Sequence, residues 1–144
     1  MKKIITNDEK GTFDFGFSFA SMLKKDSVVA LSGDLGSGKT VFVKGVAKAL
    51  NIDEHILSPT FTLLRQYSGL NHFDVYRIED ESELIEIGFL EYLNDENITI
   101  IEWANLIYDL MPDDTIYVNI RKTDEINKRE IIVSDRPMDD KEKA

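Results

Sequence analysis

The sequence contains no cysteine among its 144 residues. This absence excludes disulfides and cysteine-ligated zinc or iron–sulfur centres, and it is compatible with the cytosol. No apolar run approaches the roughly 20 residues that a membrane span requires. No apolar segment follows the basic residues of the N-terminus, as a secretory signal would need. We therefore expect a cytoplasmic protein without a membrane segment.

Basic residues are scarce relative to acidic ones: 17 Lys and Arg stand against 27 Asp and Glu, which gives a formal net charge of −10. Such a surface repels the phosphates of nucleic acids, which proteins normally meet with clustered Lys and Arg. We therefore expect no direct, tight binding to DNA or RNA. If the function concerns a nucleic acid, a partner is expected to hold it.

The length of 144 residues is enough for one domain with a sizeable core and too short for two domains of ordinary size. The last ten residues, 135–144, are mostly charged. We expect a single domain over residues 1–134, followed by an acidic, disordered tail over 135–144.

A complete phosphate-binding motif, G-x-x-x-x-G-K-[ST], occupies Gly33–Thr40 and follows a short apolar run, Val28–Leu31, typical of a buried strand. Glycines let the backbone curl so that several N–H groups point at one phosphate, and the helix that begins next adds the positive end of its dipole. The lysine reaches the β/γ-phosphates and the threonine can ligate Mg²⁺. A glycine-rich turn without a ligand is the alternative, which the complete motif after a strand disfavours. The expected nucleotide-binding residues of this loop are Asp34, Leu35, Gly36, Ser37, Gly38, Lys39, Thr40 and Val41.

Two helices are predicted on either side of this motif. The second runs over residues 39–50, with a buried stripe of Phe42, Val43, Val46, Ala47 and Leu50. The first is capped by Asn7 or Asp8 and runs to about Lys24, with a buried stripe of Phe13, Phe17, Ala20 and Leu23. Thr12 and Gly16 share a face with that stripe, where they could lie near a nucleotide base.

The remaining elements are predicted from alternation and turn residues. Two strands, 62–67 and 72–77, form a hairpin with a turn at 68–71. A helix starts in the acidic segment 79–83 and continues with Leu84, Ile87, Leu90 and Leu93 on one face. Strands at 3–5, 98–101, 115–121 and 129–134 and a short helix at 104–110 complete the chain. We expect an α/β fold: a single P-loop domain whose central, largely parallel sheet is extended by antiparallel strands and has helices on both faces.

Two acidic residues stand in predicted strands. Asp74 lies between Phe73 and Val75, so its carboxylate faces either solvent or a site, and alternation alone favours solvent. Glu102 follows the strand 98–101 at its carboxyl end, the edge where open α/β sheets bind ligands and where P-loop proteins place a second Mg²⁺ group. The usual residue there is Asp, and the alternative is a glutamate in a solvated loop.

The nucleotide is expected to be ATP. The segment Asn127–Glu130 faintly resembles the guanine-reading N-K-x-D motif, but its last residue is Glu and a charged hairpin turn explains it. The one D-x-x-G, Asp8–Gly11, precedes the phosphate loop and cannot serve as a GTPase switch. Nothing in the sequence positively reads adenine.

These residues resemble the TsaE (YjeE) family, small bacterial ATPases required for threonylcarbamoyl modification of the tRNA adenosine next to the anticodon. The resemblance covers about residues 12–110. One residue departs from the family pattern: Val41 stands where the family commonly carries a second threonine. Thr40, the expected Mg²⁺ ligand, is present. The matching pieces are Thr12 with Gly16, SGDLGSGKT at 32–40, SPTF at 58–61, HFDVYR at 72–77, an acidic helix containing Gly88, and IIEWA at 100–104.

The resemblance implies a catalytic group of Lys39, Asp74 and Glu102. Mg²⁺ would be held by Thr40 and Glu102. Asp74 would orient water, support the metal or couple to a partner. Thr12 would join the nucleotide site.

The resemblance also implies that Thr60 lies in a switch-like segment that senses the γ-phosphate and joins the nucleotide site. Trp103 would either pack beside the site or contact partner proteins. The implied partners are TsaD-like and TsaB-like proteins of the threonylcarbamoyl-transfer complex, which ATP binding and slow hydrolysis would reset. Arg65 and Arg77 are candidate arginine fingers, although surface pairs explain them equally well.

Two other functions compete with this interpretation. A small P-loop kinase would need an acceptor pocket and usually an arginine-rich lid, whereas residues 78–111 contain no Lys or Arg. A nucleotide-dependent interaction module would need binding but not hydrolysis. A GTPase is disfavoured because the base-reading and switch motifs are missing.

Overall fold

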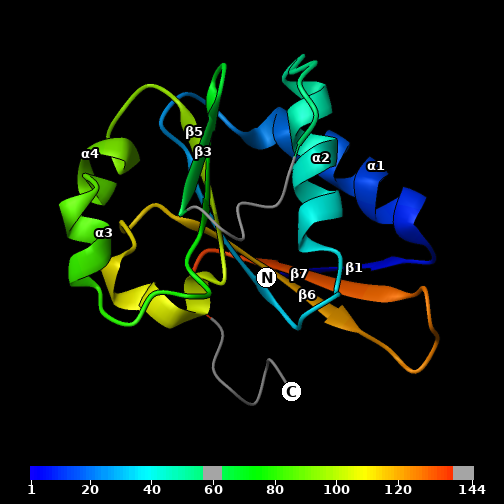
Figure 1. Ribbon diagram of the computed structural model, residues 1–144. Coiled ribbons are helices and arrows are strands. Elements are labelled where there is room, and N and C mark those ends of the chain that lie inside the picture. The colour runs from blue at the N-terminus through cyan, green and yellow to red at the C-terminus, as the bar shows by residue number, and fades with distance from the viewer. Residues whose placement is uncertain (57–62, 138–144) are drawn as a thin grey trace.

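The computed structural model describes residues 1–56 and 63–137. The predictions for Thr60, for the SPTF segment at 58–61 and for the tail beyond residue 137 fall outside these ranges. Within them, seven strands form one mixed sheet (Figure 1). In the order β1-β7-β6-β2-β5-β4-β3, their bounds are Lys2–Thr6, Arg129–Ser134, Ile116–Lys122, Val28–Gly33, Ile98–Glu102, Leu70–Asp74 and Leu64–Tyr67.

The centre of the sheet is parallel. The four central strands, in the order β6-β2-β5-β4, pair in parallel with one another, whereas β3 pairs antiparallel with β4 at one end. At the other end β7 pairs antiparallel with both β6 and β1. The expected P-loop fold class, a largely parallel sheet extended by antiparallel strands, is thus confirmed.

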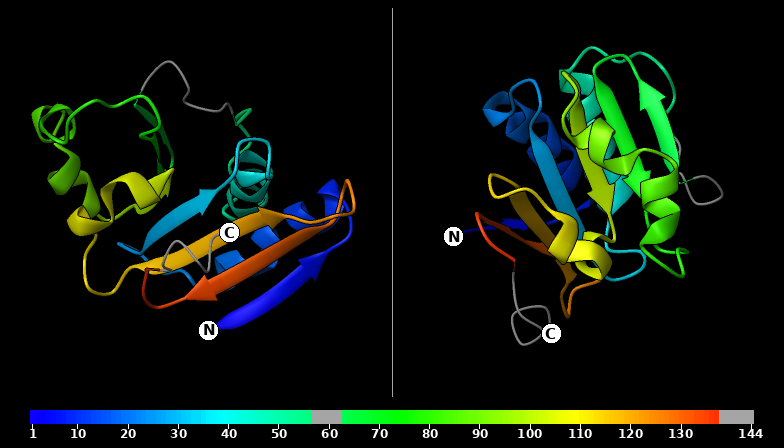
Figure 2. Two further views of the ribbon diagram at one scale, coloured as in Figure 1. Left: turned by 90° about the horizontal axis from the view of Figure 1, so that it is seen from below. Right: turned by 90° about the vertical axis from the view of Figure 1, so that its left-hand side faces the viewer.

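Helices cover both faces of the sheet (Figures 1 and 2). β2 shows the division clearly, because Val29 and Leu31 belong to one core while Val28 and Ala30 belong to the other. α1 and α2 pack on the first core, and α3, α4 and η2 pack on the second. The helices are α1 Glu9–Phe19, η1 Ala20–Met22, α2 Lys39–Ala49, α3 Ser82–Glu86, α4 Phe89–Leu93 and η2 Ala104–Leu110. None of the helices in the described ranges is long and apolar enough to cross a bilayer.

The predicted buried stripe of α1 is partly wrong. Phe17 is 49% exposed. Phe15 and Phe19 instead pack on Phe42 of α2, with ring centroids 6.0 and 5.3 Å apart. The helix is capped by the Asp8 side chain, as predicted, but it ends at Phe19 and continues only as the 3₁₀ turn η1.

The close contact between α1 and α2 explains why α1 buries a different face from the predicted one. Gly16 and Gly45 face each other there: a Cβ on Gly16 would lie 2.3 Å from the Phe42 carbonyl oxygen, and a Cβ on Gly45 would lie 2.1 Å from that of Phe13. The two backbones approach so closely that the face of α1 carrying Gly16 must turn toward α2. Hydrophobicity alone does not reveal this constraint. The four phenylalanines of α1 point to different sides of the helix, so they do not indicate which side is buried. They are Phe13, Phe15, Phe17 and Phe19.

The segment after β3 also differs from its prediction. The hairpin turn is Ser68-Gly69 alone, and β4 runs over 70–74 instead of 72–77. The single helix expected after residue 79 is two short helices, because Gly88 adopts a φ of +83° between them. The four residues predicted to share one helix face are divided, since Leu84 and Leu93 are buried whereas Ile87 and Leu90 are 40% and 44% exposed.

The other predicted elements are confirmed to within a few residues. They are the edge strand at 3–5, the apolar strand before the loop, the helix 39–50 with its buried stripe, the strands at 98–101, 115–121 and 129–134, and the short helix at 104–110.

We expect Gly45→Ala to destabilise the protein. The new Cβ would meet backbone atoms of Phe13 and Phe17, which no side-chain rotation can relieve. The free energy of unfolding should fall by about 1–3 kcal/mol, the range for overpacked sites. Ser18→Ala, on the exposed side of α1, is the control for helix propensity. Urea denaturation at 25 °C would contradict the prediction if Gly45→Ala were as stable as the wild type.

Candidate functional site

The phosphate-binding motif forms a tight strand–loop–helix connection. β2 ends at Gly33 and α2 begins at Lys39, with Gly38 at its N-cap in the left-handed region (φ +106°). A Cβ on Gly33 would lie 2.3 Å from the Ile120 carbonyl oxygen. Both positions therefore require glycine, and the loop takes the curled form that lets backbone amides converge on an anion.

A cavity of about 540 Å³ opens in front of this loop. It brings together most of the residues predicted to form the site, from the helix α1, the loop and the ends of β4 and β5. Asp34 does not line this cavity, and Thr60 lies outside the described residues. The cavity is lined by Glu9, Thr12, Leu35, Gly36, Ser37, Gly38, Lys39, Thr40, Val41, Asp74, Tyr76, Arg77, Glu102, Trp103, Asn127 and Arg129.

Lys39 is held by backbone and aromatic groups. Its Nζ donates hydrogen bonds to the carbonyl oxygens of Gly33 at 2.7 Å and Asp34 at 2.9 Å. It also lies 4.1 Å from the centroid of the Trp103 ring. Burial lowers the pKa of the Lys39 ammonium, against the opposing effect of nearby carboxylates. The lysine is thus placed at the mouth of the loop with little solvation to lose when it meets a phosphate.

Trp103 packs beside the site, the first of its two predicted roles. It adopts a left-handed backbone (φ +62°) where β5 leads into η2. The ring of Tyr76 packs against the ring of Trp103, with ring centroids 4.6 Å apart. The pair forms an aromatic wall that connects the end of β4 with the lysine of the loop.

Asp74 points into the cavity and is only 8% exposed. The preference for a solvent-facing carboxylate, drawn from alternation, is wrong because β4 lies between β3 and β5 and every residue of the strand is buried. Its Oδ1 accepts a hydrogen bond from the backbone N–H of Tyr76 at 2.9 Å. Burial raises the pKa of the Asp74 carboxyl, and the negative charge of Glu102 raises it further.

Glu102 is also buried, at 3% exposure, which excludes the alternative of a glutamate in a solvated loop. Its Oε2 lies 2.6 Å from Nε2 of His72, a side chain with no exposed surface. A carboxylate only accepts hydrogen bonds, so His72 donates this one through its Nε2–H. Nδ1 has no hydrogen-bond partner in the described part of the chain. His72 therefore orients Glu102 toward the cavity.

Thr40 and Glu102 are the residues that would hold a divalent cation. Both line the cavity, and a hydroxyl and a carboxylate supply the oxygen ligands that Mg²⁺ prefers. The described residues contain no group of three or more His, Cys, Asp or Glu arranged around a metal.

Arg129 also binds the backbone of the loop, a contact that was not predicted from the sequence. Its Nε donates to the Ser37 carbonyl oxygen at 2.8 Å and its Nη2 to that of Gly36 at 3.4 Å. Its Nη1 donates to the carbonyl oxygens of Ile126 and Lys128. The guanidinium thus connects the β6–β7 turn with the phosphate loop.

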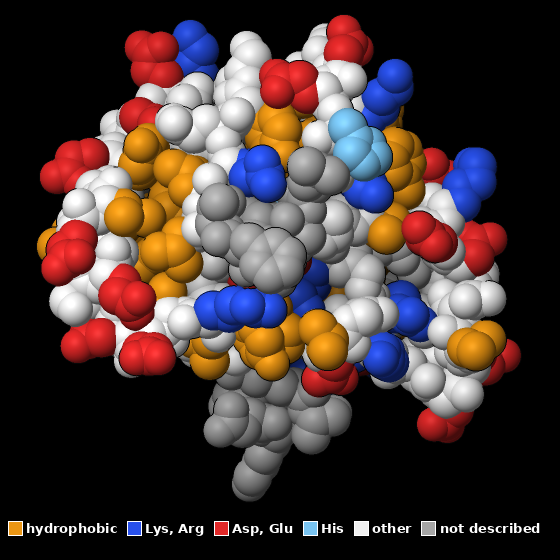
Figure 3. All heavy atoms as spheres, in the orientation of Figure 1, with side chains coloured by type: hydrophobic (Ala, Val, Ile, Leu, Met, Phe, Trp, Pro, Cys, Tyr) orange, Lys and Arg blue, Asp and Glu red, His pale blue; other side chains and the backbone are white. Residues whose placement is uncertain are grey.

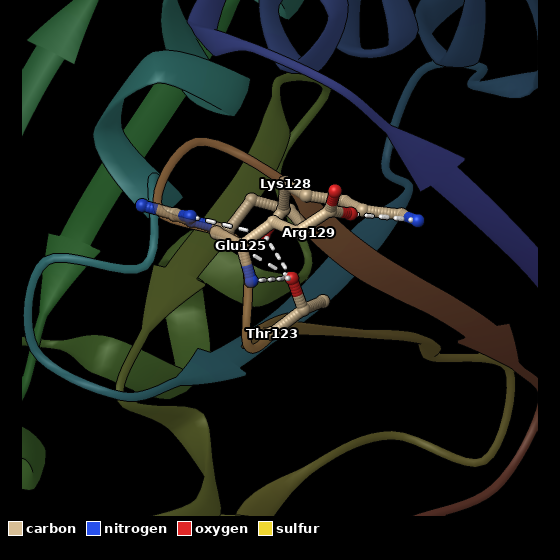
Figure 4. A network of polar contacts seen from close by, with 4 residues as sticks. All are labelled: Thr123, Glu125, Lys128 and Arg129. Atoms are coloured by element: carbon tan, nitrogen blue, oxygen red, sulfur yellow. Dashed lines mark hydrogen bonds and ion pairs between the residues drawn. The ribbon is translucent and has the colours of Figure 1, made fainter.

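The β6–β7 turn is itself fixed by polar contacts (Figure 4). The Thr123 hydroxyl contacts the carbonyl oxygens of Glu125 and Lys128, and Lys128 forms an ion pair with Glu125 at 3.0 Å. Asn127–Glu130 was interpreted as a charged hairpin turn, and it does lie at the end of this turn and the start of β7. Its proximity to the loop was not predictable, because only the sheet order places β7 there.

The two candidate arginine fingers are not equivalent. Arg77 is exposed and lines the cavity, whereas Arg65 lies on β3 and does not line it. The geometry therefore leaves Arg77 as the better candidate of the two, and its role stays a prediction.

Comparison with known proteins agrees with this geometry. The family model "Threonylcarbamoyl adenosine biosynthesis protein TsaE" matches residues 6–131. The chain is 42% identical to the tRNA threonylcarbamoyladenosine biosynthesis protein TsaE of Rickettsia typhi over 128 residues, 85% of this chain and 88% of that protein. It is 40% identical to the Bacillus subtilis protein of the same name, over 78% of this chain and 72% of that protein.

Relatives extend over nearly the full length of the chain. The Treponema pallidum protein of the same name is 37% identical over 92% of this chain and 99% of its own length. Among solved structures, the crystal structure of Bacillus subtilis YdiB is similar with a TM-score of 0.75 and 31% identity, over 90% of this chain and 82% of that one.

We expect Asp74→Asn to stabilise the folded protein at neutral pH. The pKa of Asp74 is raised in the folded state, so the stability contributed by this group falls as pH rises through the folded pKa and stays lower above it. Asparagine removes the charge and retains the acceptor for Tyr76. The difference in free energy of unfolding between Asp74→Asn and the wild type should therefore shrink as the pH is lowered through the folded pKa of Asp74 toward the ordinary pKa of the carboxyl.

Urea denaturation at several pH values measures this difference. Asp114→Asn, at an exposed position, is the control for a simple change of net charge. A lower midpoint for Asp74→Asn than for the wild type at neutral pH would contradict the prediction.

Proposed function

Because the chain belongs to the TsaE family, we propose that it is a Mg²⁺-dependent ATPase required for threonylcarbamoyl modification of the tRNA adenosine next to the anticodon. The observation that supports this best is the convergence of Lys39, Asp74 and Glu102 on one cavity in front of the phosphate loop. These are one cation for the phosphates and two carboxylates for the metal and the attacking water.

The chain's own residues divide the work of hydrolysis. Amides of the loop and the Lys39 ammonium bind the β- and γ-phosphates and stabilise charge that builds up on them. Thr40 and Glu102 would hold Mg²⁺, which would supply positive charge to offset the charge of the phosphates. Asp74 accepts a hydrogen bond from the water that attacks the γ-phosphorus in line.

Several groups position these residues without touching the phosphates. His72 fixes the Glu102 carboxylate, and Trp103 and Tyr76 exclude water from one side of Lys39. Arg129 restrains the loop through two carbonyl oxygens. Its guanidinium is thereby directed at the backbone of the loop, so it is not our candidate for an arginine finger.

Hydrolysis by the chain alone is expected to be slow, because a site without a complete set of groups for the transition state turns over slowly. We propose that ATP binding and hydrolysis reset a complex of TsaD-like and TsaB-like proteins between modification cycles in the cytoplasm. The acidic surface of the chain is consistent with this proposal, because the partner proteins would bind the tRNA and the chain need not bind it itself.

Nucleoside analysis of tRNA tests the pathway. In cells depleted of this chain, threonylcarbamoyladenosine should fall and be restored by the wild type. Lys39→Ala should fail to restore it, because the phosphates lose their cation. Lys48→Ala, on the exposed side of the same helix, should restore it fully. Unchanged modification on depletion, or rescue by Lys39→Ala, would refute the proposal.

Glu102→Gln separates hydrolysis from nucleotide binding. With the transferase proteins present, we expect ATP hydrolysis to fall roughly 100-fold, as for loss of one preorganised transition-state group. ATP affinity measured without Mg²⁺ should stay unchanged. Glu54→Gln, at an exposed position, controls for charge. If Glu102→Gln abolished hydrolysis but fully supported tRNA modification in cells, the chain would be a nucleotide-dependent interaction module and not a working ATPase.

A further inference from the structure

Three aliphatic side chains on α3, α4 and the turn between them face solvent. Ile85 is 50% exposed, Ile87 40% and Leu90 44%. We call these residues the α3–α4 face. The same segment buries a different set in the core beneath, namely Leu84, Phe89 and Leu93.

These exposed side chains are not needed for the fold, because the buried set already covers the sheet. Figure 3 shows hydrophobic side chains gathered over α3 and α4 with acidic side chains around them. Other exposed hydrophobic residues, such as Ile126 on the β6–β7 turn and Met22 in η1, belong to separate elements. Grouped apolar side chains with a polar rim are typical of protein interaction sites.

The rim carries charge of one sign. The chain has no Lys or Arg at all from residue 78 to residue 111. The exposed acidic residues on and next to the two helices are Glu79, Asp80, Glu83, Glu86 and Glu91. An occupant must therefore bring apolar groups to the centre and cations to the edge.

This charge discriminates between classes of occupant. A second copy of the chain, meeting this face symmetrically, would place like charges opposite each other. Nucleic acids and anionic membranes would be repelled for the same reason. A protein surface with an apolar centre and a rim of Lys or Arg complements the face in both respects.

The face is physically connected to the nucleotide site. Phe73, which precedes Asp74 in β4, packs against Phe89 and Tyr92 of α4 with ring centroids 5.0 and 5.8 Å apart. Beyond Asp74 the chain passes Tyr76, which packs on Trp103, and then enters α3. A partner on this face thus contacts helices packed directly on the strand that carries Asp74.

We propose that the α3–α4 face docks a protein partner whose apolar centre is ringed by Lys and Arg. This inference rests on the proposed function, because it assigns the face to the TsaD-like and TsaB-like complex. Apolar contacts at the centre supply affinity, and the acidic rim steers association.

Binding of purified TsaD-like and TsaB-like proteins to defined variants tests the proposal. Ile85→Ser combined with Leu90→Ser should weaken binding at least about 10-fold, because central apolar contacts dominate interface affinity. Affinity for ATP and the denaturation midpoint should stay unchanged, since these side chains are outside the core and the cavity. Ile126→Ser, which removes an 87% exposed isoleucine elsewhere, is the matched control.

The charged rim is tested separately. Glu86→Gln combined with Glu91→Gln should lower the association rate and flatten its dependence on salt, as rim charges act mainly on encounter. Asp53→Asn combined with Glu54→Gln removes two exposed charges at another place and should change neither.

The outcomes distinguish this inference from the proposed function. If the wild type and Ile85→Ser/Leu90→Ser bind the complex equally well, the face is not the docking site, while the proposed partnership stands. If the wild type does not bind the complex in any nucleotide state, both fail together. If Ile85→Ser/Leu90→Ser instead dissociates a dimer of this chain in sedimentation, the occupant is a second copy and the inference is overturned.

Discussion

The parallel pairing of β2, β5 and β4 is the constraint on which the candidate site depends. In this register Leu31 lies opposite Glu102, and Glu102 lies opposite Asp74. Parallel strands present their carboxyl ends at one edge of the sheet, so the phosphate loop after β2 and both carboxylates emerge together. A register shift of one residue in either pair would turn a carboxylate to the other face and separate it from Lys39.

The site concentrates charge where burial makes charge unfavourable. Lys39, Asp74 and Glu102 are all at least nine-tenths buried. The two carboxylates oppose the effect of burial on the pKa of Lys39, whereas Glu102 adds to the effect of burial on the pKa of Asp74. A low-dielectric setting strengthens their action on a phosphate, at the expense of stability in the same region. The apolar packing of both sheet faces and the close contact between Gly16 and Gly45 supply stability elsewhere.

The parts predictable from sequence were those encoded locally. The phosphate loop, the strand before it and Glu102 at the end of β5 follow from motif and apolar pattern alone. The direction of Asp74 did not, because alternation cannot choose a face in a strand buried on both; the family resemblance supplied it. Arg129 was missed because its contact with Ser37 spans 92 positions and depends on sheet order.

The break at Gly88 divides the segment after β4 into helices of only five residues each, too short to be stable through their own hydrogen bonds. They are held by a few side chains on the sheet, whereas α2 has eleven residues and a packed partner helix. Backbone amides of α3 and α4 should therefore exchange with solvent through local opening at a lower free energy than those of α2 or β2. The protein thus combines a stable phosphate-binding half with a segment that can reorganise while that half stays folded.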